Sequence, residues 1–276
     1  MCRILALASR RPRPPVELLG ERAVKEFVAL SHEHPDGWGV AWVDGRGDGV
    51  HTERSVEPAY ADSRLVALLH ETPATGLFLH LRWATPGFPV SLPNTHPFRD
   101  GERVAFAHNG ALRAGEALEG LVPPRLRDRR RGTSDSEAYF LRFLGEWRDD
   151  VSGGLARAVE SVTDVCTPSG LNAVVLTPTT LAAVCWYDPA SPPPHPDPAG
   201  GPPHGSAQSD PDYYTLRVWH MPDAVVIASS GWPRGGGPEG ARGGHEVLPN
   251  GSVLTCPLDT LATETRVLGP HKSASA

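Results

Sequence analysis

The chain begins Met1-Cys2-Arg3, and the cysteine at the second position is the first residue that could do chemistry. Removal of Met1 would give Cys2 a free α-amino group beside its own thiol. A thiol is a nucleophile, and an α-amine with a pKa of about 7.7–8.0 can accept and return a proton near neutral pH. The alternative is that Cys2 is a small buried residue of a first strand, as free cysteines often are.

Five further polar clusters could complete a site around such a nucleophile. Four of them adjoin strand-like segments, and the fifth opens a helix. They are HPDGWGV (34–40), HLRWATPG (80–87), NTHPF (94–98), FAHNGAL (106–112) and TSDSEA (133–138). An amidase needs an oxyanion hole and groups that hold the amino-acid end of its substrate, and these clusters contain residues of both kinds.

Taken in this order with Cys2, the motifs resemble the class II glutamine amidotransferases, a family of N-terminal-nucleophile hydrolases. The resemblance is closest to the small stand-alone branch that includes the amidohydrolase of ergothioneine biosynthesis. It covers residues 1–145 strongly and the β-rich remainder loosely. Any single motif is weak, but five in the family order together with Cys2 are specific. The resemblance implies an α+β fold, the four-layer αββα sandwich, in which two stacked, mainly antiparallel sheets are flanked by helices.

The resemblance also implies which residues catalyse. Cys2 would be the nucleophile once Met1 is removed, and Asn109 and Gly110 would form the oxyanion hole. An asparagine amide and a glycine backbone N–H can both point at one oxygen, and glycine lets the backbone approach closely. Taken alone, Asn109-Gly110 would be interpreted as a hairpin turn, because Asn-Gly is a strong signal for one.

Four residues would bind the glutamyl end of the substrate. Arg82 would hold the α-carboxylate, since a guanidinium can donate two parallel hydrogen bonds to it. Thr85 would add a hydroxyl or backbone contact, and Trp83 would form a wall with its backbone beside the substrate. Asp135 would accept the α-ammonium from the first turn of a helix that Ser134 caps. A surface ion pair for Arg82 and simple helix-terminal placement for Asp135 are the alternatives.

The remaining polar residues of the clusters are expected to support the site. Residues 36–39 are interpreted as architecture, and Asn94 and His96 as bracing residues. His80, His96 and His108 lack the H-x-x-x-H or H-E-x-x-H spacing of a zinc site, so we expect neither a metal nor another cofactor.

The expected activity is cleavage of the γ-amide of glutamine, or of a small γ-glutamyl compound, through a Cys2 thioester that releases glutamate. One alternative is a glutaminase subunit that supplies ammonia to a separate synthase partner, because no synthase-sized segment follows residue 145. Another is a non-catalytic binding protein on the same scaffold. The family pattern predicts ASEP after a late strand, whereas this chain has ASSGWP (228–233), so the substrate stays open.

Composition excludes other classes of function. The net charge of −6 provides no general attraction for nucleic acid, and the basic run RLRDRRR (125–131) is expected to be a solvated loop. A nucleic-acid binder that uses this run is the weaker alternative. No segment approaches the ~20 apolar residues of a membrane span. The four cysteines show no C-x-x-C spacing, which argues against a disulfide framework and favours the cytoplasm.

The hydrophobic pattern predicts the elements that must position these residues. We expect strands at 2–8, 37–44, 50–56, 76–85 and 103–110, and helices at 14–31, 58–70, 134–147 and 153–165. PFRDG (97–101) is interpreted as a turn. Five strands follow at 171–177, 181–188, 213–220, 224–230 and 251–257. The chain is expected to be a single domain over 1–276, with a disordered Pro/Gly-rich insertion in a hairpin at 189–212 and a flexible tail at 270–276.

Overall fold

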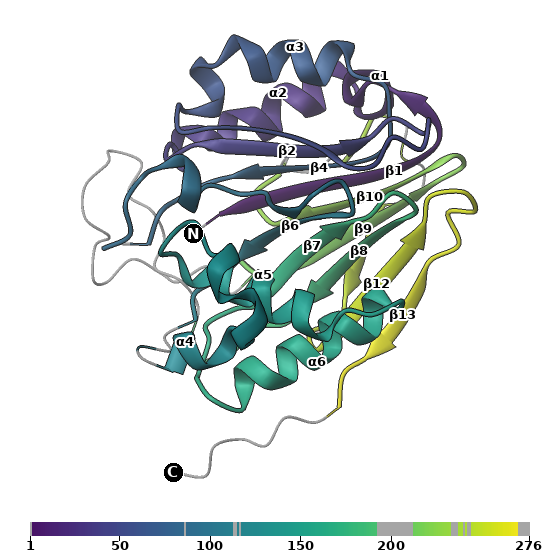
Figure 1. Ribbon diagram of the computed structural model, residues 1–276. Coiled ribbons are helices and arrows are strands. Elements are labelled where there is room, and N and C mark those ends of the chain that lie inside the picture. Colours follow the sequence, from purple (N-terminus) through teal and green to yellow (C-terminus); the bar gives the residue numbers. More distant parts are fainter. Residues whose placement is uncertain are drawn as a thin grey trace.

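Two antiparallel sheets stack face to face, and helices cover both outer faces (Figure 1). The computed structural model describes residues 2–85, 87–112, 115, 117–191, 212–232, 237–239, 241 and 244–269. Every strand pairing within each sheet is antiparallel. The αββα layering that the resemblance implied is therefore confirmed.

The two sheets differ in which part of the chain they use. The larger sheet has seven strands, in the order β11 (Glu246–Leu248), β9 (Leu216–Met221), β10 (Ala224–Ser229), β1 (Arg3–Arg13), β4 (Ala74–Leu81), β2 (Trp38–Val43) and β3 (His51–Ser55). The other has six, in the order β13 (Glu264–Val267), β12 (Ser252–Pro257), β8 (Thr180–Cys185), β7 (Asn172–Leu176), β6 (Val104–Asn109) and β5 (Phe98–Asp100).

The helices form the outer layers. The seven-stranded sheet is covered by α1 (Pro15–Leu19), α2 (Glu21–Ala29) and α3 (Ser63–Glu71). On the side of the six-stranded sheet lie α4 (Ala117–Leu121), α5 (Asp135–Glu146) and α6 (Val151–Thr163). Short 3-10 turns occur at Leu30–His32, Ala59–Ala61, Leu92–Asn94 and Pro124–Arg129.

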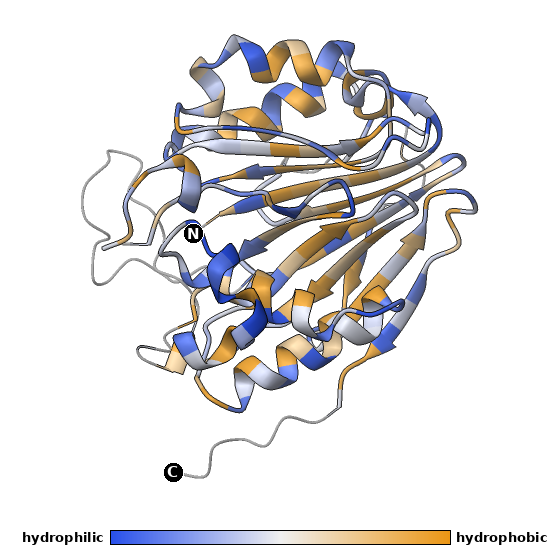
Figure 2. Ribbon diagram, viewed as in Figure 1, coloured by the Kyte–Doolittle hydropathy of each residue, from blue (hydrophilic) through white to orange (hydrophobic). Residues whose placement is uncertain are grey.

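Strand β1 shows how the sequence pattern builds the layers. Ile4, Ala6 and Ala8 belong to the apolar cluster between the sheets, whereas Leu5 and Leu7 pack in the cluster under α1, α2 and α3. Successive side chains of a strand point to opposite faces, so a strand buried on both faces must be apolar throughout. The central strands in Figure 2 are accordingly orange along most of their length. This double burial fixes the start of β1, and with it the position of Cys2.

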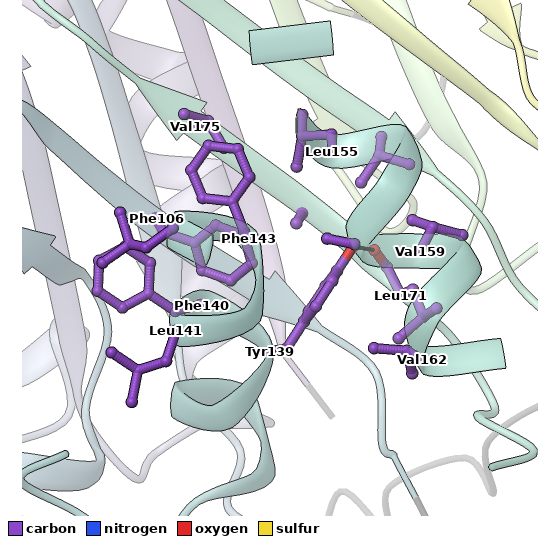
Figure 3. Packing of buried hydrophobic residues seen from close by; sticks show 14 of the residues in the cluster. Phe106, Tyr139, Phe140, Leu141, Phe143, Leu155, Val159, Val162, Leu171 and Val175 are labelled. Atoms are coloured by element: carbon purple, nitrogen blue, oxygen red, sulfur yellow. Dashed lines mark hydrogen bonds between the residues drawn. The ribbon is translucent and has the colours of Figure 1, made fainter. Parts of the chain in front are cut away.

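A third apolar cluster holds α5 and α6 against the six-stranded sheet. Phe106 of β6 packs against Tyr139, Phe140 and Phe143 of α5, with ring centroids 5.2, 5.6 and 5.9 Å apart (Figure 3). Aromatic pairs at these separations contribute about 0.5–1.5 kcal/mol each beyond the burial of their area. The start of α5 is thereby fixed relative to the end of β6.

Three predicted elements differ from the structure. The single helix expected at 14–31 is two helices, because Gly20 between them has φ of +89°, a conformation that no α-helix contains. The predicted turn at 97–101 was wrong at Phe98–Asp100, where β5 pairs with β6. The basic run was expected to be a loop, but Pro124–Arg129 forms a 3-10 helix.

The hairpin expected around 189–212 was also wrong. Strand β8 lies in the six-stranded sheet and β9 in the seven-stranded sheet, so the connection between them passes from one sheet to the other. Residues 192–211 of the predicted insertion and the predicted tail at 270–276 lie outside the described residues. The short strands β11 and β13 were not predicted, because most of their residues are exposed and carry no alternating pattern.

Candidate active site

Strand pairing brings together residues that are far apart in the sequence. Cys2 immediately precedes β1, and the pairing of Arg3 with Leu81 sets it beside the end of β4, where Arg82 follows. Asn109 is the last residue of β6 in the other sheet. The N-terminus in Figure 1 accordingly lies at the same end of the sandwich as the ends of β4 and β6. Cys2 is therefore positioned where the two sheets meet.

Asn109 makes the most informative contact of the site. Its side chain is fully buried, and its Oδ1 accepts a hydrogen bond from the nitrogen of Cys2 at 3.0 Å. Its Nδ2 is also buried but has no hydrogen-bond partner among the described residues. An unsatisfied buried donor costs about 1–3 kcal/mol, so it is an unusual feature of a native core. The amide oxygen of Asn109 is therefore held by Cys2, while its amide nitrogen is available to donate a hydrogen bond to a ligand.

The thiol of Cys2 lies in a buried setting. Its Sγ is 3.7 Å from the carbonyl oxygen of Trp83, and the residue is 8% exposed. Burial raises the pKa of the Cys2 thiol, and the hydrogen bond to the Trp83 carbonyl and the charge of Arg82 act in the opposite direction. A thiol with a raised pKa is protonated at neutral pH, so a base must remove its proton before it can attack.

Gly110 lies against another part of the chain. A Cβ placed on Gly110 would be 1.8 Å from the carbonyl oxygen of Gly170, so no larger residue fits. That same carbonyl accepts from, or lies beside, Nε2 of His108 at 3.1 Å, while Nδ1 of His108 is 2.9 Å from the Ser136 hydroxyl. The Asn-Gly pair does not form a two-residue hairpin turn here, because the chain continues to α4 before it reaches β7.

Arg82 is buried and is held by the DGWG segment. Its backbone N–H donates to Gly37 O at 2.8 Å, and its guanidinium donates to Asp36 O at 3.3 Å and Pro89 O at 3.2 Å. Among the described residues no carboxylate lies within ion-pair distance of this guanidinium. The charge is therefore oriented by carbonyl groups and has no fixed anionic partner. Asp36 also accepts from Ala84 N at 2.7 Å, which fixes the segment that carries Trp83 and Thr85.

Asp135 begins α5 and lines the same pocket as Cys2 and Arg82. Its Oδ2 accepts from the backbone N–H of Leu112 at 2.8 Å, and its Oδ1 from Ser136 N at 2.8 Å. Ser134 caps the helix by accepting from Glu137 N, as the sequence predicted. The carboxylate is thus held in place by two backbone donors on a helix whose first turn favours negative charge.

Three buried histidines support the floor of the site. The rings of His80 and His96 lie 4.1 Å apart, and Nε2 of His80 is 3.2 Å from the carbonyl oxygen of His108. Burial lowers the pKa of His80 to about 3 and that of His96 well below its ordinary range, so both are neutral at pH 7. In the described part of the chain, no group of three or more His, Cys, Asp or Glu residues is arranged to hold a metal ion.

A pocket opens beside Cys2, and most of the predicted site residues line it. It is bounded by Cys2, Arg82, Trp83, Thr85, Gly110 and Asp135, with Asn109 bonded to Cys2 behind it. Sequence reasoning assigned no role to four other residues of its wall, namely Ala84, Phe88, His108 and Ser136. Ser136 stands in the TSDSEA cluster, which was a usable signal. Tyr213, whose hydroxyl donates to the carbonyl oxygen of Cys2 at 3.3 Å, lies in a distant segment and gave none.

The ASSGWP segment packs behind Cys2. Ser229 Oγ accepts from Ile4 N at 3.0 Å, and Ser230 Oγ accepts from the Arg3 guanidinium at 2.8 Å. Trp232 is buried and donates to Ala23 O at 2.8 Å. The segment that stands where the family pattern predicted ASEP therefore holds the first residues of β1 through the hydrogen bonds of Ser229 and Ser230.

Comparison with known proteins agrees with this geometry. Residues 1–177 match the family model for class II glutamine amidotransferases. The YafJ protein of Escherichia coli is 34% identical over 117 residues, which are 40% of this chain and 42% of YafJ. The gamma-glutamyl-hercynylcysteine sulfoxide hydrolase of Mycolicibacterium smegmatis is 25% identical over 220 residues, 78% of each protein. The chain matches less than half of the length of YafJ and of the relatives from Methanocaldococcus jannaschii and Haemophilus influenzae.

Solved structures show the same fold at low sequence identity. A glutamine aminotransferase class-II domain protein from Silicibacter pomeroyi, 22% identical, superposes with a TM-score of 0.62 over 98% of this chain and 100% of its own. The glutamine phosphoribosylpyrophosphate amidotransferase of B. subtilis, 15% identical, gives 0.63 over 96% of this chain and 49% of its own. No helix in the described part of this chain has the length and apolar character to cross a membrane. Its motifs, its fold and the family match over residues 1–177 together show that the chain belongs to the class II glutamine amidotransferases.

Proposed function

We propose that this protein is an amidohydrolase that cleaves the γ-amide of glutamine or of a small γ-glutamyl compound through a thioester on Cys2. The observation that carries the proposal is the buried side chain of Asn109. Its Oδ1 holds the nitrogen of Cys2, and its Nδ2 is a buried donor on the same amide with no partner in the described protein. A preorganised donor of this kind stabilises the negative oxygen that forms when a nucleophile attacks a carbonyl.

In the first half of the reaction, the α-amine of Cys2 is the base. After removal of Met1 this amine takes the thiol proton, which it must do because burial raises the pKa of the thiol. The sulfur attacks the γ-carbonyl carbon, and the displaced electron pair becomes an oxyanion that accepts from Asn109 Nδ2 and from the backbone N–H of Gly110. The oxyanion collapses, the C–N bond breaks, and the leaving amine takes its proton from the α-ammonium of Cys2.

In the second half, the α-amine removes a proton from water, and the resulting hydroxide attacks the thioester carbon. The same donors hold the second oxyanion, and its collapse breaks the C–S bond to give glutamate and the thiolate of Cys2. The thiolate then takes a proton from the α-ammonium, which restores the thiol and the free amine. No redox or group-carrying step occurs, so the reaction as written uses no cofactor.

The cytoplasm stays the predicted compartment for this reaction.

The glutamyl part of the substrate has partners for both of its charged ends. Arg82, which has no anionic partner among the described residues, would bind the α-carboxylate together with Thr85. Asp135 would accept the α-ammonium, and Trp83 would form the wall beside Cys2. None of these residues selects the leaving amine. The relative from M. smegmatis, which aligns over 78% of each protein and is named as the hydrolase of a γ-glutamyl sulfoxide compound, supports a small γ-glutamyl compound as the substrate.

The test is a panel of γ-glutamyl amides and glutamine, with glutamate release as the measurement and Cys2→Ala as the control. We expect release by the native protein and none by the variant. Best turnover of free glutamine would favour an ammonia-supplying subunit with a synthase partner. Release that persists in Cys2→Ala, or no release from any member of the panel, would overturn the proposal and favour a binding protein.

A further inference from the structure

A second pocket lies near the catalytic one and shares none of its lining residues. Its walls come from β3, β5, α5 and the basic run that the sequence analysis expected to be a solvated loop. Four arginines line it, namely Arg54, Arg99, Arg129 and Arg131. In a chain with a net charge of −6, such a concentration of positive charge is unexpected.

The positive charge of this pocket is only partly neutralised. Two carboxylates line it, but Asp100 already binds Arg129 at 2.6 Å, and Glu137 accepts from the backbone N–H groups of Arg131 and Gly132. In the described residues, the guanidinium groups of Arg54, Arg99 and Arg131 form no ion pair. The pocket is thus lined by four positive charges and only two negative ones.

Arg54 is the least exposed of these cations and has the strongest need of an anion. Its guanidinium donates to the carbonyl oxygens of Thr95 at 2.8 Å and Pro97 at 3.4 Å, and the residue lines the pocket. Burial and the charge of Arg99 lower its pKa, and Glu137 offsets this in part. Burying a charge without an opposite charge is costly, and a bound anion would remove that cost.

The other wall of the pocket is apolar. It consists of Phe98, Phe140, Leu141 and Leu144, with Pro93 at its edge. In Figure 3, Phe140 and Leu141 lie on one side of α5 and Tyr139 on the other, so these two side chains are directed away from α6. A ligand that fills the pocket would therefore contact both the guanidinium groups and the small exposed parts of these apolar side chains.

We propose that this pocket binds a small organic anion, a carboxylate or phosphate carried on an apolar body. Arg54 and Arg99 bind the anionic group, and the Phe98–Phe140 wall packs against the rest. A guanidinium suits both anions because it donates parallel hydrogen bonds to two oxygens. The pocket adjoins the catalytic one through Arg54, which holds the carbonyl groups on either side of His96.

The experiment is calorimetric titration of the full chain with benzoate, phenyl phosphate, inorganic phosphate and the neutral analogue benzamide. We expect binding of benzoate and phenyl phosphate, weaker binding of inorganic phosphate, and none of benzamide. Arg54→Gln should weaken binding by about tenfold or more, the loss expected for a charge-assisted hydrogen bond. Because Arg54 also holds two carbonyl groups, Arg99→Gln is the second variant, and its exposed side chain makes no described hydrogen bond.

Two controls show whether the anions bind in this pocket and not elsewhere on the protein. Arg22→Gln removes an exposed arginine on α2 and should leave binding unchanged. Cys2→Ala removes the catalytic thiol and should also leave benzoate binding unchanged, which keeps this test independent of the proposed reaction. Equal binding of benzamide and benzoate, native affinity in both Arg54→Gln and Arg99→Gln, or binding of an acidic peptide without binding of the small anions would overturn the proposal.

Discussion

Asn109→Ala is expected to lower turnover strongly while leaving the fold nearly as stable as before. The substitution removes the hydrogen bond from Cys2 N to Oδ1, worth about 1 kcal/mol. It also removes the buried, unpaired Nδ2, whose burial costs about 1–3 kcal/mol. These effects oppose each other, so the free energy of unfolding should change by no more than about 2 kcal/mol. Loss of one oxyanion donor should lower kcat by about 10²–10³, or about 2.7–4 kcal/mol of barrier.

Asn94→Ala is the matched control, because Asn94 lines the same pocket but has all its polar atoms paired. Its Oδ1 accepts from Thr133 N at 2.7 Å and Ser134 N at 3.1 Å, and its Nδ2 donates to Pro89 O and Thr133 Oγ1. This variant should lose about 2–4 kcal/mol of stability by the same energies.

The assay for both variants is glutamate release per folded molecule, with stability measured by urea unfolding. Asn109→Ala should lose activity and keep its stability, whereas Asn94→Ala should lose stability. This expectation is refuted if Asn109→Ala keeps its kcat within about tenfold of the native value, since removal of an oxyanion donor costs more than that. It is also refuted if Asn109→Ala is destabilised as strongly as Asn94→Ala.

Three further substitutions or conditions test other parts of the site. Gly110→Ala should lower both stability and activity, because its Cβ would lie 1.8 Å from Gly170 O, whereas Gly120→Ala has open space and should be neutral in the same unfolding and glutamate assays. Arg82→Lys should raise KM for glutamine by about tenfold or more through loss of bidentate binding, and an unchanged KM would argue against carboxylate recognition there. The pKa of His80 is about 3 in the folded protein and near 6.5 when unfolded, so stability should fall as pH drops below 6.5, by about 2 kcal/mol at pH 5. Urea unfolding at pH 7 and pH 5 measures this loss, and His80→Gln should reduce it; an equal loss in the variant would show that His80 does not contribute.

The core elements could be predicted because their apolar residues and helix caps form recognisable sequence patterns. Strand β1 is apolar on both faces over residues 4–8, and the S-D-S-E pattern marks the start of α5 with its capping serine. The break at Gly20 was missed because apolar positions continue at helical spacing on both sides of it. The strands β11 and β13 were missed because their residues are mostly exposed, so only pairing with a neighbour defines them.

The candidate site could be predicted as a set of residues but not as a geometry. Spacing alone cannot show that Gly110 touches Gly170, since 60 residues separate them and two strands must pair first. Nor can it show that, within the described part of the chain, Nδ2 of Asn109 lacks a partner and the Arg82 guanidinium lacks an anion, because an unmet hydrogen bond is a property of packing. The second pocket was invisible for the same reason, as its arginines come from three separate segments.

Intact-mass analysis after reaction with an electrophilic glutamine analogue, one that carries a diazoketone in place of the side-chain amide, tests the central claim most directly. We predict a protein that has lost Met1 and gained one adduct, with peptide mapping placing the adduct on the Cys2 sulfur and excess glutamine preventing it. An active protein that retains Met1, or an adduct on Cys166, Cys185 or Cys256 in place of Cys2, would contradict the account.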